Sequence, residues 1–132
     1  MPILWTFRCY VSSRGVDEIR AAYDAASKKV RARFLARLQM LAQLPPDEWH
    51  SSYYKKLSGE CEGLWEIRFE ADNVPQRPLG YRSGALEFTL LLWARERNDR
   101  FIPVNACEQA LHRKAECLAF GDRTNAFWLP LE

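Results

Sequence analysis

Residues 63–94 read GLWEIRFEADNVPQRPLGYRSGALEFTLLLWA and decide the fold class. They hold three runs rich in aromatic, aliphatic and β-branched residues: Leu64 to Ala71, Arg77 to Arg82, and Glu87 to Ala94. Turn residues separate these runs at Asp72-Asn73 and Ser83-Gly84. Because the connections are short, we expect three antiparallel strands in a meander.

The N-terminal third predicts a strand followed by helix. Ile3 to Val11 has strand composition. From Val16 to Leu44, apolar residues recur at steps of three and four until Pro45-Pro46 forbids further helix. A single helix over that length would span about 45 Å, which is too long for so small a domain. We therefore expect two packed helices, with Ser27-Lys28 as the candidate break.

The C-terminal part predicts one more helix and an apolar tail. Pro103 suits a first helical turn, and the helix should end near Gly121. The tail, Asp122 to Glu132, should dock onto the body or onto a partner. With 132 residues the chain fits one domain. The predicted fold is α+β in the order β-α-α-β-β-β-α, with a mainly antiparallel four-stranded sheet packed against helices.

The sequence also indicates a compartment and a redox state. The longest apolar run is only of strand length, and the first residues lack the pattern of a secretory signal, so we expect a cytoplasmic protein with no membrane contact. The spacing of the cysteines fits neither a disulfide framework nor a zinc site. We expect buried reduced thiols, no metal and no cofactor. The four cysteines are Cys9, Cys61, Cys107 and Cys117.

Positive charge is concentrated although the formal net charge is only +2. Five of the 19 basic residues lie between Lys28 and Arg37, and three arginines crowd the later stretch Arg95 to Arg100. Local patches of this kind suit a polyanion. The basic helix could grip ribosomal RNA or an acidic segment of a partner, and a solvated helix face is the alternative.

The second half of the chain resembles a known family. Lys55-Lys56-Leu57-x-Gly59, followed by Gly-Leu-Trp-Glu-Ile-Arg at 63–68, is similar to the "K-x-L-x-G … G-L-W-E-L-R" passage of HigB-like and phage-derived toxins. These toxins belong to the RelE/ParE superfamily of bacterial toxin–antitoxin systems. The similarity covers about residues 53–118 and continues through Arg77, the strand ending Leu91-Leu92-Trp93, the turn Arg95-Glu96-Arg97, and Pro103 with Ala110 and Arg113.

The resemblance implies a single RelE-like toxin domain over residues 1–132. Its expected activity is that of a ribosome-dependent, metal-independent messenger-RNA endonuclease that promotes attack of a ribose 2′-hydroxyl on the adjacent phosphate. The expected partners are the ribosome with its messenger RNA and a cognate helix-turn-helix (HigA-like) antitoxin.

Three arginines are the first candidate catalytic residues. By the resemblance, Arg77 and Arg95 match phosphate-binding arginines, and Arg68 occupies a position often held by a basic catalytic residue. A guanidinium stays protonated and presents a fixed fork of donors to phosphate oxygens. Because the three residues lie on or just after neighbouring strands, we expect antiparallel pairing to bring them to one face of the sheet. A salt-bridged, solvated sheet face is the alternative.

Glu66 and two lysines complete the strand-borne candidates. Glu66 lies two residues before Arg68, on the same strand face, and could accept the 2′-hydroxyl proton. Alternatively it is an ion-pair partner of Arg68 or Arg77. Lys55 and Lys56 could contact backbone phosphates, or they form an exposed loop pair.

The basic turn supplies two further RNA-binding candidates, Arg97 and Phe101. Phe101 could stack on a base. It falls where some ribosome-dependent relatives carry a tyrosine, and it lacks the hydroxyl for proton transfer. The turn also departs from the family pattern, because Trp93 precedes Pro103 by ten residues and Glu96 replaces a basic residue.

Two prolines bear on the third predicted strand. Pro75 and Pro78 flank Arg77, which predicts a short, edge-like or bulged strand there.

Two other functions are compatible with the same resemblance. One is a non-enzymatic ParE-like toxin that binds gyrase, and the other is an inactive module that binds an antitoxin or a phage protein. Fold alone does not choose among them. The Glu-Ile-Arg run with Arg77 and Arg95 favours the RNA-cleaving branch.

Overall fold

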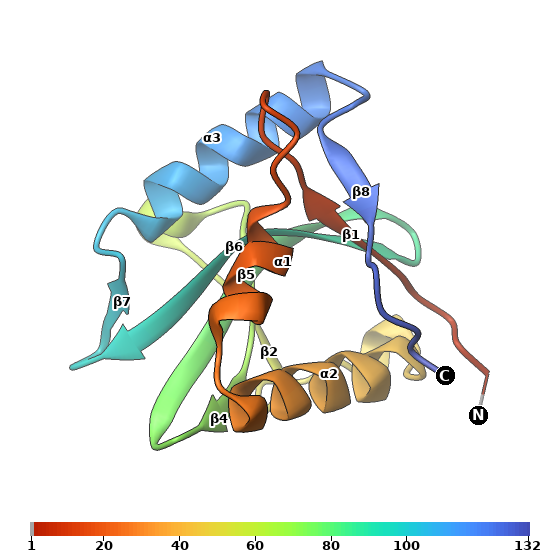
Figure 1. Ribbon diagram of the computed structural model, residues 1–132, viewed down its shortest axis with the longest axis vertical. Coiled ribbons are helices and arrows are strands. Elements are labelled where there is room, and N and C mark those ends of the chain that lie inside the picture. Colours follow the sequence, from red (N-terminus) through yellow and green to blue (C-terminus); the bar gives the residue numbers. More distant parts are fainter. Residues whose placement is uncertain (1) are drawn as a thin grey trace.

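The computed structural model describes residues 2–132. In this range the chain forms three α-helices and eight strands, and the strands make up one sheet (Figure 1). The sheet order is β2-β3-β5-β6-β1-β8, with β4 pairing to β5 and β7 to β6. The helices are α1 Glu18–Ala25, α2 Lys28–Ala42 and α3 Ala106–Ala119. The strands are β1 Thr6–Tyr10, β2 Tyr54–Lys56, β3 Trp65–Ile67, β4 Phe69–Ala71, β5 Val74–Gly84, β6 Glu87–Arg97, β7 Arg100–Ile102 and β8 Thr124–Ala126.

The predicted four-stranded, mainly antiparallel sheet is wrong. The sheet has eight strands and is mixed, because β1 runs parallel to β6, with Phe7 opposite Phe88. Five of the strands, β2, β3, β4, β7 and β8, contain only three residues each. A segment that short cannot display the alternation from which a strand is predicted. A parallel pair needs a long connection between its strands, and the chain between β1 and β6, which includes α1 and α2, provides it.

The two predicted N-terminal helices are confirmed, and each begins at a capping side chain. Asp17 accepts a hydrogen bond from the backbone N–H of Arg20, and Ser27 Oγ accepts one from Val30. The break therefore falls at the predicted Ser27-Lys28. The apolar stripe of α2 is fully buried and consists of Val30, Phe34, Leu38, Leu41 and Ala42.

Arg77 lies in a long interior strand, not in a short or edge-like one. β5 has 11 residues and lies between β3 and β6. Proline is tolerated there because β3 pairs with β5 through Leu79 and Gly80, and β4 pairs with it through residues 74–76. Pro78 thus falls in the gap between the two partner strands, where no N–H is needed on that side. The β5–β6 ladder does change register, but at two later places, between Leu79 and Gly80 and between Arg82 and Gly84.

The sheet buries a core on each face. One core is aromatic, lies under α2 and includes Trp5, Phe34 and Phe88. The other lies under α3 and includes Leu79, Leu91 and Ala106. Leu91 and Leu92 both join this second core because the bulge opposite Gly80 turns two successive side chains to one face.

The C-terminal tail docks onto the body of the domain, which was one of the two predicted alternatives. β8 pairs antiparallel with β1, with Asn125 opposite Cys9. Beyond β8, Trp128 packs edge-on against Tyr23, with ring centroids 5.4 Å apart. Within residues 2–132, no helix combines the length and apolar character needed to cross a membrane.

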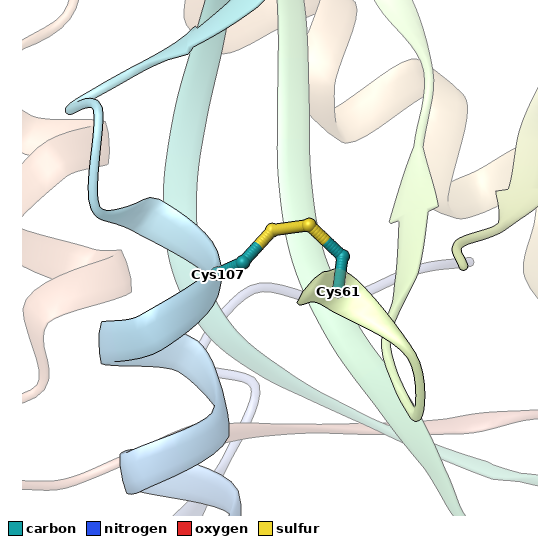
Figure 2. The surroundings of a disulfide bond; sticks show 2 residues. All are labelled: Cys61 and Cys107. Atoms are coloured by element: carbon teal, nitrogen blue, oxygen red, sulfur yellow. A yellow bond between two sulfur atoms is a disulfide. The ribbon is translucent and has the colours of Figure 1, made fainter. Parts of the chain in front are cut away.

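The expectation of four reduced thiols is wrong for two of them. Cys61 and Cys107 form a disulfide that joins the short 3₁₀ turn Gly59–Cys61 to the first turn of α3 (Figure 2). Cys9 and Cys117 are free. The bridge links residues 46 positions apart, so no local spacing of cysteines predicts it. It fixes the loop between β2 and β3 to the helix that covers one face of the sheet.

Candidate anion-binding groove

An open groove of about 840 Å³ lies between α2 and the junction of β3 and β4. Four arginines line it: Arg33, Arg37, Arg68 and Arg77. We call it the arginine groove; its other lining residues are Ala36, Met40, Ser51, Ser52, Phe69 and Glu70. Such a density of fixed positive charge makes the groove a candidate site for an anion.

Arg68 interrupts the strand and so forms one wall of the arginine groove. Its backbone N–H bonds to the Tyr53 carbonyl at 2.7 Å, and its own carbonyl accepts a hydrogen bond from Arg37 Nη1. The side chain is 32% exposed, and Nη1 donates to the Ser51 carbonyl at 3.0 Å. Arg68 is therefore held at its base but reachable at its tip.

Glu66 lies beneath Arg68. Its Oε2 is 3.1 Å from Arg68 Nε and 3.2 Å from Arg77 Nε, and its side chain is 5% exposed. Burial raises the pKa of Glu66 above its usual value, and the guanidiniums of Arg77 and Arg68 oppose this shift. Glu66 therefore serves as the ion-pair partner of both arginines, which was one of the two predicted roles.

Arg77 forms the floor of the arginine groove and is buried among protein groups. Its Nη1 donates to the carbonyl of Gln76 at 2.9 Å and, more weakly, to that of Phe69 at 3.4 Å. Its Nε also lies 3.5 Å from Glu96 Oε1. With only 5% of the side chain exposed, Arg77 contributes charge to the floor more than free donors.

The wall formed by α2 carries two arginines, which the sequence analysis identified as part of a basic run but not as site residues. Arg33 and Arg37 are four residues apart and so share one helix face. Arg37 lies 4.9 Å from the centroid of the Tyr53 ring, and partial burial lowers its pKa from the usual high value while leaving it charged at neutral pH. Arg33 is exposed. Their helical spacing was visible in the sequence, but their proximity to Arg68 was not.

Arg95 does not reach the arginine groove, so the predicted convergence of three arginines is wrong. In the β5–β6 ladder, Arg77 pairs with Ala94 and Gln76 pairs with Arg95. Because successive side chains of a strand point to opposite faces, Arg77 and Arg95 project from opposite sides of the sheet. Arg95 lines a different cavity, next to Gln76 and Trp93.

The remaining predicted residues are also placed apart from the arginine groove. Lys55 and Lys56 are exposed on the edge strand β2, with Lys55 opposite Glu66 and Lys56 Nζ 5.9 Å from the Trp65 ring centroid. Arg97 and Phe101 belong to the β6–β7 hairpin. None of the four lines the groove.

The chain matches no family model, no curated protein and no solved structure. The resemblance to RelE/ParE toxins therefore rests on the residues of the sequence alone and stays a prediction.

Proposed function

We propose that this chain is the toxin of a toxin–antitoxin pair and that it cleaves messenger RNA in the arginine groove. The observation that supports the proposal is the Glu66 carboxylate held between Arg68 and Arg77 beneath an open wall of guanidiniums. Arg33 and Arg37 bind phosphates on either side of the reacting one, because arginine forks match phosphate oxygens.

The reaction is an internal transfer at phosphorus. The ribose 2′-oxygen attacks the adjacent phosphorus, the P–O5′ bond breaks, and the products carry a 2′,3′-cyclic phosphate and a 5′-hydroxyl. Glu66 takes the 2′-hydroxyl proton after Arg68 turns its exposed guanidinium onto the phosphate and uncovers the carboxylate. Water supplies the proton that the departing 5′-oxygen needs, and no metal takes part.

A second candidate is a module that binds RNA without cutting it. The observation that favours it is the burial of Arg77, because a side chain that is only 5% exposed has little access to a transition state. In that case Glu66 only positions Arg68.

Induced expression in a bacterial host, with RNA sequencing, tests the proposal. Cleavage predicts growth arrest with loss of translated messenger, and Glu66→Gln should abolish both while purified protein still binds RNA. Arrest with intact messenger and DNA damage would instead indicate a gyrase-directed toxin. RNA binding without arrest or cleavage by the native chain would support the non-cutting module and overturn the enzyme.

A further inference from the structure

The β6–β7 hairpin presents three arginines on one face. Arg97 and Arg100 are directly opposite in the ladder, and Arg95, two residues before Arg97, shares their side. All three are exposed. The hairpin is closed by Asn98 and Asp99, whose φ angles of 52° and 61° are those of a tight two-residue turn. We call Arg95, Arg97 and Arg100 the hairpin arginines.

These three guanidiniums form no ion pair with any residue that the structure describes. Among residues 2–132, no carboxylate lies within 4.0 Å of any hairpin arginine, and Glu96 points to the opposite face, where it contacts Arg77. Like charges directly opposite in an antiparallel pair destabilise the hairpin. The arrangement therefore has an electrostatic cost in the isolated chain that an anionic partner would remove.

Arg95 also lines a cavity of about 520 Å³, together with residues of α1 and of the start of α2. Its wall is made mostly of small apolar side chains, and of its lining residues only Asp72 is acidic. Asp72 Oδ2 already accepts a hydrogen bond from Ser27 Oγ at 2.8 Å. The apolar lining residues are Ala22, Ala25, Ala26, Val30, Ala71, Val74 and Trp93.

We propose that the hairpin arginines and this cavity together bind an acidic segment of a protein partner, with an aliphatic side chain of that segment in the cavity. The positive face selects the carboxylates, and the alanine-lined cavity fits an aliphatic anchor beside them. The site is separate from the arginine groove, because no residue that lines one cavity lines the other.

The cavity argues for a peptide over RNA. A nucleobase binds by stacking on an aromatic face or by hydrogen bonds to its edge. The one aromatic ring in the cavity, Trp93, is already stacked on Phe34 with centroids 4.3 Å apart, and its Nε1 donates to Gln76 at 2.8 Å.

Fluorescence anisotropy with three probes tests the site: a labelled peptide in which leucines alternate with glutamates, labelled polyglutamate, and labelled polyuridylate. We expect the leucine–glutamate peptide to bind most tightly, and Arg97→Glu with Arg100→Glu to weaken it more than about tenfold. The matched control is Arg14→Glu, which changes an exposed arginine of the turn between β1 and α1 and should leave peptide binding unchanged.

A second pair of variants tests the cavity itself. Ala22→Trp should fill it and abolish peptide binding, whereas Ala21→Trp, on the exposed side of α1, should not. Equal affinity for polyglutamate, or unchanged binding in Arg97→Glu with Arg100→Glu, would overturn the proposal. A third result would also overturn it: the native chain binds no peptide, and the Arg97→Glu with Arg100→Glu variant loses polyuridylate binding. That result would assign the hairpin to RNA. Loss of RNA cleavage in a groove variant bears only on the proposed enzyme.

Discussion

Arg77 and Arg95 project from opposite faces of the sheet, although their backbones lie on adjacent strands. The ladder pairs Arg77 with Ala94, the residue before Arg95. One position of register thus places the two side chains in different cavities, Arg77 in the arginine groove and Arg95 in the cavity beside α1.

That separation gives a first prediction for RNA binding. Arg33→Ala and Arg37→Ala should each weaken RNA binding and reduce the slope of log affinity against log salt by about 0.7, because each removes one phosphate contact. Lys29→Ala, an exposed change on the same helix outside the groove, is the matched control. Filter binding over a salt series measures the slope, and equal slopes in all three variants would exclude the groove as the RNA site.

The pH dependence of cleavage tests the role of Glu66. A proton acceptor works only when ionised, so the single-turnover rate should rise with pH through the pKa of Glu66. Burial places that pKa above its ordinary value of 4.5, so the rise should occur at higher pH than for an exposed glutamate. A quench-flow pH series measures the profile. A rate that is already constant at the ordinary glutamate pKa would remove Glu66 from proton transfer.

Local signals in the sequence predicted the two N-terminal helices well, whereas α3 begins at Ala106, after the Pro103 that was expected in its first turn. The apolar steps of α2 and the candidate break at Ser27-Lys28 involve residues close in the chain, and α2 begins at Lys28. The turn at Asp72-Asn73 is confirmed for the same reason, since both residues adopt positive φ angles of 55° and 60°.

The candidate site could be predicted only in part because it depends on register. The gap between β3 and β4, which places Arg68 beside Arg77, arises from pairings that no local pattern encodes. Arg37 joins them only through the packing of α2 on β4. The Cys61–Cys107 bridge has the same character, since its 46-residue separation matches no short motif.

The disulfide should be a major contributor to stability. Closing a loop of 46 residues in the unfolded chain corresponds to about 4 kcal/mol in the loop-entropy account. Cys61→Ser with Cys107→Ser should therefore lower the free energy of unfolding in urea by about that amount. Adding a reductant should destabilise the native chain to the same level. The free, half-buried Cys117 supplies the control: Cys117→Ser should leave the reductant effect intact.

Gly80 should not tolerate a methyl group. A Cβ at this position would overlap the Thr89 carbonyl oxygen and lie 2.5 Å from Phe88 Cε1, at the bulge where β5 and β6 change register. We expect Gly80→Ala to cost at least about 2 kcal/mol, because both neighbours are buried and cannot withdraw. Gly121→Ala is the control, since nothing lies within 4 Å of its Cβ. Similar urea midpoints for the two variants would contradict the close packing.

Glu66 and Arg77 should be strongly coupled in a double-mutant cycle. Glu66→Leu alone leaves a buried guanidinium without its nearest carboxylate and should cost about 3–5 kcal/mol, and Arg77→Met alone has the converse effect on Glu66. The double variant replaces both charges with apolar groups, so its cost should fall short of the sum by about 1–3 kcal/mol. Asp122 and Arg123, 4.0 Å apart with Asp122 exposed, form the comparison pair, whose coupling should be near zero. Additive effects at Glu66 and Arg77 would mean that Glu96 and the backbone carbonyls already satisfy Arg77, and that Glu66 belongs with Arg68 alone.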